Sequence, residues 1–239
     1  MLRRILIVAL IAGGLSGAVM SGVQMIWSVP LIIAAEAFEN APADASPSLH
    51  THADGHLHDH QSGAVWAPEG PYERTFWTVV TNVLFGVGAG LVMTAFLALR
   101  RNPTTVRTGL LFGAAAFASF SFAPALGLPP ELPGMAAADL QGRQAWWFMT
   151  ALGTAIALAV LVYAPQMWMR VLAVLIIALP HLIGAPQAAS HETAVPYDLI
   201  REFIAASLIT TAIFWLALGG LVGALAEKFN LGQTETAAA

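Results

Sequence analysis

Long apolar runs that are almost free of charge are the feature that most constrains how this chain can fold. The stretch from position 5 to position 35 contains no charged residue. Of the 239 residues, 57% are hydrophobic and 10% are charged, which is more apolar surface than a soluble domain of this size can bury. Because helices that face lipid need no such burial, the sequence predicts an all-α, polytopic transmembrane helix bundle in a lipid bilayer.

Six apolar segments are candidates for spans if a crossing needs about 20 residues. They cover 5–35, 75–99, 108–123, 145–162, 171–183 and 203–226. The third and the fifth are short, and each runs into a Pro-rich stretch, at Pro124 and at Pro180, where a helix should kink or end. We therefore predict about six spans, with five as the alternative, in a single membrane domain over 1–239. Residues 36–74 form its long external loop.

The basic residues predict the orientation of the spans. With six crossings, most of them fall on one side of the membrane: Arg3, Arg4, Arg100, Arg101, Arg107, Arg170 and Lys228. Only Arg74, Arg143 and Arg201 fall on the other side. Since basic residues are enriched in cytoplasmic loops, both termini are predicted to be cytoplasmic.

Small residues recur every four positions in several of the predicted spans. Such spacing favours close approach of helices in lipid, so we predict that these residues lie at helix contacts. The pairs and triplets are Gly13 with Gly17, Gly14 with Ala18 and Gly22, Gly86 with Gly90, Gly109 with Gly113, and Gly219 with Gly223.

The external loop carries a cluster of candidate metal ligands at every second position: His50, His52, Asp54, His56, His58 and His60. Neutral imidazole binds divalent first-row metals near pH 7, and in an extended strand alternate side chains project to one side. The Ala-, Pro- and Ser-rich flanks predict that part of the loop is disordered. The pattern thus indicates a low-affinity metal collector, while a pH-responsive or functionally silent loop remains the alternative.

His181, at the outer end of the fifth apolar segment, is a second candidate ligand. An ionisable group near the edge of the hydrocarbon needs a partner or a wet cavity, which makes it a functional hypothesis. The structural alternative is a histidine that only bonds a carbonyl freed by Pro180 or Pro186, and the sequence does not choose between the two. Four acids on the same predicted side could supply oxygen ligands: Glu36, Glu39, Glu131 and Asp139.

A few other polar and aromatic residues stand out against the apolar spans. Gln24 and Asn82 are strongly polar and deep enough in their spans to line a path. Tryptophans, among them Trp146 and Trp147, are predicted to be anchors at the membrane interface.

Several kinds of protein are disfavoured by what the sequence lacks. There is no cysteine, so any metal must be held by nitrogen and oxygen ligands. No phosphate-binding loop of the Gly-x4-Gly-Lys-Ser/Thr type occurs, and His191-Glu192 lacks the second histidine of a His-Glu-x-x-His protease. We therefore expect no enzyme activity, no prosthetic group and no nucleic-acid partner.

Five motifs carry a resemblance to a known family. They are Val-Pro-Leu-Ile-Ile-Ala-Ala-Glu-Ala-Phe-Glu before the histidine loop, Trp-Ala-Pro-Glu-Gly-Pro-Tyr-Glu-Arg-Thr after it, Pro-Ala-Leu-Gly-Leu-Pro-Pro-Glu-Leu-Pro-Gly-Met, Asp-Leu-Gln-Gly-Arg-Gln-Ala-Trp-Trp and Leu-Pro-His-Leu-Ile-Gly-Ala-Pro. Together they resemble the CbtA family, the larger subunit of a predicted bacterial cobalt transporter. The resemblance covers nearly the whole chain.

The resemblance implies a multi-pass protein of the bacterial inner membrane that takes up Co²⁺, often in connection with cobalamin synthesis. It also implies a small single-span partner, CbtB, with a histidine motif of its own, and a family usually described with about five spans. Glu36, Glu39, the loop histidines, Glu131, Asp139 and His181 carry over as motif positions.

The residues alone do not fix the metal, because nitrogen and oxygen ligands that accept Co²⁺ also bind Ni²⁺ and Zn²⁺. The sequence and the resemblance together favour a cobalt-uptake subunit whose loop collects metal and whose outer Glu and His residues pass it into the bundle. The alternative is a membrane scaffold or a pH or metal sensor that uses the histidine loop without transport. Association of the chain with itself also remains open.

Overall fold

The computed structural model describes residues 1–39, 68, 70–100, 102–190 and 192–231 of this chain. Within these residues every regular element is helical, which confirms the predicted all-α bundle. In chain order the elements are α1 (Leu2–Ile26), α2 (Ser28–Glu39), α3 (Pro71–Leu99), α4 (Val106–Phe117), the π-helical turn η1 (Ala118–Phe122), α5 (Ala123–Ala125), α6 (Leu140–Tyr163), α7 (Met167–Ile183) and α8 (Tyr197–Lys228).

Five helices of the described chain are long and apolar enough to cross a membrane: α1, α3, the continuous stretch Val106–Ala125, α6 and α8. They coincide with five of the six predicted segments. The fifth segment corresponds to α7, which has only 17 residues and contains Pro180. Such a helix is about 25 Å long, which is near the lower limit for a crossing.

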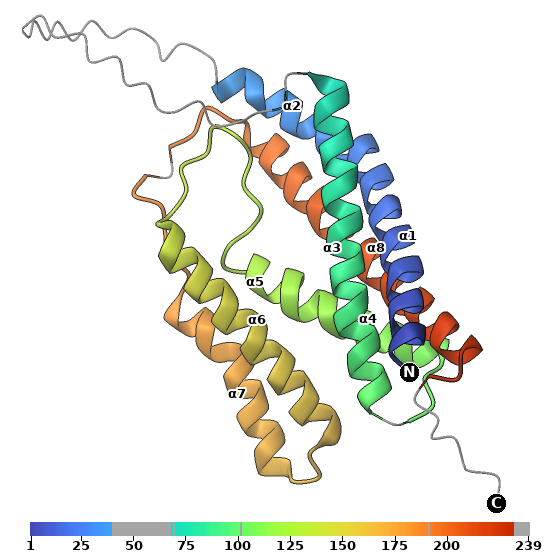
Figure 1. Cartoon of the computed structure of the whole chain (residues 1–239). Coiled ribbons are helices and arrows are strands. Elements are labelled where there is room, and N and C mark those ends of the chain that lie inside the picture. Colours follow the sequence, from blue (N-terminus) through green and yellow to red (C-terminus); the bar gives the residue numbers. More distant parts are fainter. Residues whose placement is uncertain (40–67, 69, 101, 191, 232–239) are drawn as a thin grey trace, which may run out of the picture.

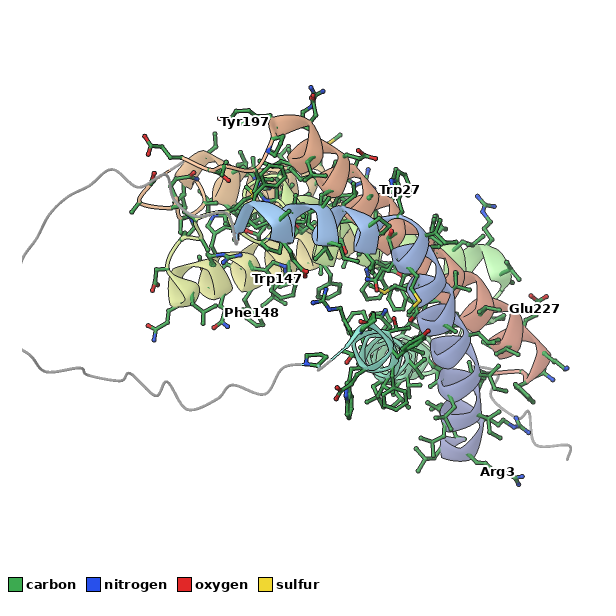
Figure 2. The ribbon with its side chains drawn as sticks, turned by 90° about the horizontal axis from the view of Figure 1, so that it is seen from above. Arg3, Trp27, Trp147, Phe148, Tyr197 and Glu227 are labelled. Atoms are coloured by element: carbon green, nitrogen blue, oxygen red, sulfur yellow. The ribbon has the colours of Figure 1, made fainter. Side chains whose placement is uncertain are left out.

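The first predicted span is not one continuous helix, because the chain bends at Trp27. The N–H of Trp27 still donates to the carbonyl of Val23 at 3.0 Å, but α1 ends at Ile26 and α2 begins at Ser28. Pro30 explains the break, since it has no N–H with which to bond the carbonyl of Ile26. Figure 2 shows α1 and α2 meeting at an angle beside Trp27.

The beginning of α1 and the end of α8 lie at the same end of the bundle (Figure 1). There the guanidinium of Arg4 donates to the carbonyl of Phe229 at 3.3 Å. A chain that returns to its starting end must traverse the bundle an even number of times, and α7 supplies the sixth traverse. The number of membrane crossings and the cytoplasmic location of this end remain predictions.

Glycines allow α1 and α3 to touch through their backbones, as their spacing predicts. A Cβ atom on Gly13 would overlap the carbonyl oxygen of Gly86, and one on Gly17 would lie 2.7 Å from the Cα atom of Val83. Gly90 completes the contact, because its missing side chain makes room for the backbone of Ala9.

Backbone contacts at glycines also join α4 to α8. A Cβ atom on Gly109 would overlap the carbonyl oxygen of Gly219, and one on Gly223 would lie 2.8 Å from the Cα atom of Val106. For Gly14 and Gly22 the predicted contact is wrong, because no atom outside their own turn lies within 4 Å of a Cβ at either position. These two glycines lie on a different face of α1 from Gly13 and Gly17.

The helices thus form two groups. Buried side chains of α1, α3 and α8 share one core, which contains Val8, Leu97, Phe214 and Leu218. By contrast, α6 and α7 pack mainly on each other, and α6 reaches the other helices through η1, α5 and a short contact with α4. Ala173 is the only buried residue of α7, so this α6–α7 hairpin has most of its surface open to lipid.

Candidate functional site

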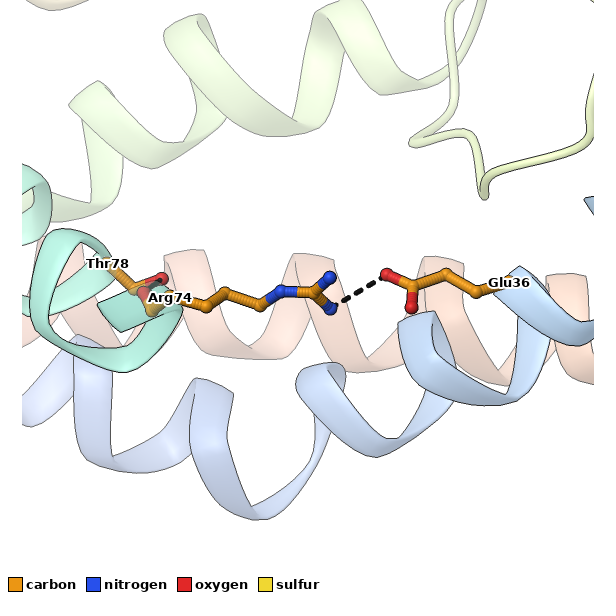
Figure 3. Close-up of polar contacts among 3 residues, drawn as sticks. All are labelled: Glu36, Arg74 and Thr78. Atoms are coloured by element: carbon orange, nitrogen blue, oxygen red, sulfur yellow. Dashed lines mark hydrogen bonds and ion pairs between the residues drawn. The ribbon is translucent and has the colours of Figure 1, made fainter. Parts of the chain in front are cut away.

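An acid–arginine pair lies at the end of the bundle opposite the start of α1 and the end of α8. Arg74, in the first turn of α3, donates to the carboxylate of Glu36 on α2 at 2.8 Å. Figure 3 shows the guanidinium reaching across from α3 to α2. The hydroxyl of Thr78, one turn further along α3, donates to the carbonyl of Arg74 at 2.8 Å. Glu36 therefore has a cationic partner 38 positions away in the sequence.

A second pair of the same kind joins the Pro-rich segment after α5 to the start of α6. The carboxylate of Glu131 lies 3.0 Å from the guanidinium of Arg143, and the two side chains are 26% and 30% exposed. Asp139 does not take part in this pair. Its carboxylate accepts the backbone N–H of Gly142 at 2.8 Å and thereby caps the N-terminus of α6.

Arg74 of the first pair borders a cavity of about 240 Å³, which we call the break cavity because it adjoins the bend between α1 and α2. Arg74 contributes to its wall, together with helices α1, α2, α3 and α8. Most of its other polar lining residues carry hydroxyl groups. The uncharged polar residues that line it are Gln24, Ser28, Thr75, Thr78, Ser207, Thr210 and Thr211.

The second pair borders a larger cavity of about 710 Å³, which we call the hairpin cavity because α6 forms one of its walls. Glu131, Arg143 and Trp147 line it, and Figure 2 shows Trp147 projecting from α6. Ser207 and Thr211 of α8 line both cavities. One short stretch of α8 therefore contributes to the walls of both cavities.

The π-helical turn η1 forms part of the wall of the hairpin cavity through Ser121. Such turns insert one extra residue into a helix and often lie at functional sites. The indole N–H of Trp215 on α8 donates to the hydroxyl of Ser121 at 3.2 Å, which holds the turn against α8. Pro124, two residues after the end of η1, lacks the N–H that would continue the helix.

Gln24 and Asn82 have different roles in the structure. The amide of Asn82 donates to the hydroxyl of Ser21 at 3.1 Å and to the side-chain oxygen of Gln24 at 2.6 Å. Asn82 thus cross-links α1 and α3 beside the glycine contact. Gln24 also lines the break cavity, whereas Asn82 lines neither this cavity nor the hairpin cavity, and a path lined by these two residues stays a prediction.

His181 lies near the end of α7 against Trp146 of α6, with the two rings edge to face and their centroids 5.7 Å apart. Its Nε2 atom is buried and has no hydrogen-bond partner in the described part of the chain. The structural alternative, a bond from this histidine to a freed carbonyl, is not made by Nε2. The carbonyl of Pro180 instead accepts the indole N–H of Trp146 at 3.3 Å.

The prediction that Trp146 is an interfacial anchor is wrong. This side chain is only 5% exposed, and its ring fills a space that a Cβ atom on Gly127 would occupy. Burial is tolerated because the indole N–H has the carbonyl of Pro180 as a partner.

The candidate ligands are not gathered at one point in the described structure. Over residues 1–39, 68, 70–100, 102–190 and 192–231, no group of three His, Asp or Glu residues could hold a metal ion. Glu36 and Glu131 belong to different ion pairs, Asp139 caps a helix, and His181 contacts Trp146. The side chain of Glu39 lies outside the described part, as do His50, His52, Asp54, His56, His58 and His60. The role of all these candidate ligands in metal binding remains a prediction.

Two features of the site are not predicted by the sequence. One is the pairing of Glu36 with Arg74 and of Glu131 with Arg143; the only signal was that each arginine stands at the start of a span. The other is the run of hydroxyls on α8, where Ser207, Thr210 and Thr211 fall at positions i, i+3 and i+4. That spacing puts them on one helix face, and polar residues there could have indicated a cavity.

Comparison with known families decides the class of this protein. The family model for CbtA, described as a probable cobalt transporter subunit, matches residues 2–227. The chain belongs to the CbtA family. No curated protein and no solved structure matches it. Members of the CbtA family are transporter subunits, which implies a partner, and the five long apolar helices agree with a multi-pass membrane protein.

Proposed function

We propose that this CbtA-family protein carries Co²⁺ into the cell across the bacterial inner membrane, together with a small single-span CbtB-like subunit. The observation that carries the proposal is the position of two carboxylates, Glu36 and Glu131, each paired with an arginine that lines a cavity. The family match supports the metal and the subunit role. The basic end of the bundle, where α1 begins and α8 ends, is the cytoplasmic end in this proposal.

The ion pairs suggest how a cation would be received. A guanidinium beside a carboxylate occupies the place that a metal ion would take, so the arginine must move aside before the metal binds. A divalent ion is attracted to the carboxylate about twice as strongly as a guanidinium at the same separation. We infer that Arg74 and Arg143 neutralise the negative charges of Glu36 and Glu131 until Co²⁺ displaces the two arginine side chains. Glu39, Asp139 and His181 remain candidate ligands for the next step.

The proposal is tested by metal accumulation in cells that lack their own uptake systems. We expect cobalt to accumulate when the chain is expressed with its candidate single-span partner, and nickel and zinc counted in the same samples to rise less. Expression of the chain alone shows whether the partner is required. Unchanged accumulation of all three metals would contradict the proposal and favour a scaffold or sensor.

Deletion of residues 50–60 is expected to raise the Co²⁺ concentration needed for half-maximal uptake severalfold. The maximal rate should stay unchanged, because the proposed task of the loop is to raise the local concentration of the ion. Initial uptake rates over a range of Co²⁺ concentrations measure both quantities. The control replaces the same residues with a Gly-Ser segment of equal length, and a normal concentration dependence in that variant would remove the histidines from the mechanism.

His181→Phe is expected to lower the maximal rate of Co²⁺ uptake while the protein stays folded. Phenylalanine can keep the ring contact with Trp146, and it removes a buried nitrogen that has no hydrogen-bond partner among the described residues. The free energy of unfolding should therefore stay the same or rise by about 1 kcal/mol. Uptake kinetics and the melting temperature in detergent measure the two effects. A normal maximal rate would mean that the role of His181 is limited to packing against Trp146.

A further inference from the structure

We propose that the break cavity is a binding site for Na⁺, the ion whose inward gradient drives import of the metal. The proposal has a binding part, that Na⁺ binds in the break cavity, and a coupling part, that the Na⁺ gradient drives metal import. The coupling part rests on the proposed transport function, whereas the binding part does not. The chemistry of the lining residues and the bend between α1 and α2 both support such a site.

The hydroxyl groups that line the break cavity have oxygen lone pairs that can coordinate a cation. Ser28 and Thr210 are 6% and 1% exposed, and neither hydroxyl oxygen has a hydrogen-bond partner within the described residues. An unsatisfied buried polar group is costly unless something binds it. Thr78 and Thr211 donate their hydroxyl protons to backbone carbonyls of their own helices, so their oxygens can still accept a cation.

The bend frees backbone carbonyls in two of the residues that line the cavity. Because α1 ends at Ile26, the carbonyls of Gln24 and Met25 have no donor four residues later within α1, and both residues line the cavity. The C-terminal end of a helix also carries a partial negative charge. Transporters use this arrangement, in which an interrupted helix offers carbonyls to a bound Na⁺.

The same residues disfavour other ions. No carboxylate or imidazole is among the described residues that line the break cavity, so a transition metal would find only weak neutral oxygen ligands there. A proton would find no carboxylate or imidazole among them to carry it. The charged lining residue is Arg74, and its charge is compensated by Glu36 at 2.8 Å. The lining residues therefore offer mainly neutral oxygen ligands, and these suit a hard monovalent cation.

The position of Arg74 links the two ions. A cation held in the break cavity repels the guanidinium at its rim and weakens the hold of Arg74 on Glu36. Glu36 then becomes more accessible to Co²⁺, and Co²⁺ on Glu36 in turn keeps Arg74 displaced. Binding of each ion thus favours binding of the other, as reciprocal coupling between two sites requires.

The binding part is tested with the purified full-length protein in detergent and radioactive ²²Na⁺, without cobalt. We expect saturable binding that excess Na⁺ displaces and excess K⁺ or choline does not. The double variant Ser28→Ala/Thr210→Val should weaken this binding about tenfold or more. Absence of saturable Na⁺ binding to the folded wild-type protein overturns the proposal, as does equal displacement by K⁺.

A matched control comes from two other buried hydroxyls that have no partner within the described structure. Ser16 and Thr150 are fully buried and do not line the break cavity, so Ser16→Ala/Thr150→Val should leave Na⁺ binding unchanged. Equal weakening in the control would overturn the assignment to this cavity. Melting temperatures in choline chloride show that both double variants fold. If the first one does not, Ser28→Ala alone is compared with Ser16→Ala.

The coupling part is tested in vesicles that contain the protein and its partner. We expect Co²⁺ uptake to fall severalfold when external Na⁺ is replaced by choline. Na⁺ binding together with Co²⁺ uptake that is indifferent to Na⁺ would overturn the coupling role. If no Co²⁺ uptake occurs in any salt while ²²Na⁺ still binds, the proposed transport function fails and the Na⁺ site stands.

Discussion

Gly13→Leu is expected to destabilise the bundle strongly, whereas Gly14→Leu is expected to leave its stability almost unchanged. At position 13 a side chain would overlap the backbone of Gly86 and come within 2.6 Å of the Cα atom of Val87. Backbone atoms cannot rotate away as a flexible side chain can, so α1 and α3 must separate. At position 14 nothing outside the local helix lies within 4 Å of a Cβ atom.

The expected cost of Gly13→Leu is roughly 3 kcal/mol or more, at the upper end of the range for overpacked sites. For a chain of this size such a loss lowers the melting temperature by roughly 6 to 12 °C. Thermal unfolding in detergent and the monodisperse fraction in size-exclusion chromatography measure the effect. Equal behaviour of the two variants would mean that α1 does not use this face.

Glu131→Gln and Arg143→Gln are expected to have opposite effects on Co²⁺ uptake. If the carboxylate receives the metal, its loss should reduce uptake at low Co²⁺ about tenfold or more, the effect of losing roughly 1.4 kcal/mol of binding. Removal of the arginine should instead lower the half-saturating concentration, because the competing cation is gone. Uptake kinetics over a range of Co²⁺ concentrations separate the two cases.

The stability of these two variants provides the check. A partly exposed ion pair contributes about 1 kcal/mol or less, so both should unfold at similar temperatures. A purely structural pair would behave differently, since either substitution would then reduce uptake by the same factor. Glu227→Gln, near the end of α8 at the opposite end of the bundle, is the control and should leave uptake unchanged.

Hydrophobicity was enough to predict the helices, because the cost of exposing backbone to lipid leaves few other structures for such runs. The bend at Trp27 was missed although Pro30 marks it, since a run without charge reads as one continuous span. The glycine spacing predicted close contacts but not which face of α1 makes them. Gly13 with Gly17 and Gly14 with Ala18 have the same four-residue spacing, and only the position of α3 distinguishes them.

The site was less predictable than the fold, because its contacts join residues that are far apart in the chain. Glu36 meets Arg74 only because the side chain of Arg74 reaches from the start of α3 to α2, and Pro30 marks the bend before α2 but not the direction that α2 takes. Trp146 looks like an interfacial residue by type, but Gly127 and the carbonyl of Pro180 together provide it with a buried position. The acids and His181 were therefore identified as candidates without their actual neighbours.

The uneven packing of the helices has a mechanical consequence. Glycine-mediated backbone contacts join α1 to α3 and α4 to α8, and these pairs cannot slide or tilt without atoms colliding. The α6–α7 hairpin has no comparable contact with them and carries both Arg143 and His181. We expect the α6–α7 hairpin to move as a rigid body relative to the two glycine-joined helix pairs. We expect this movement to open and close the hairpin cavity around a bound ion.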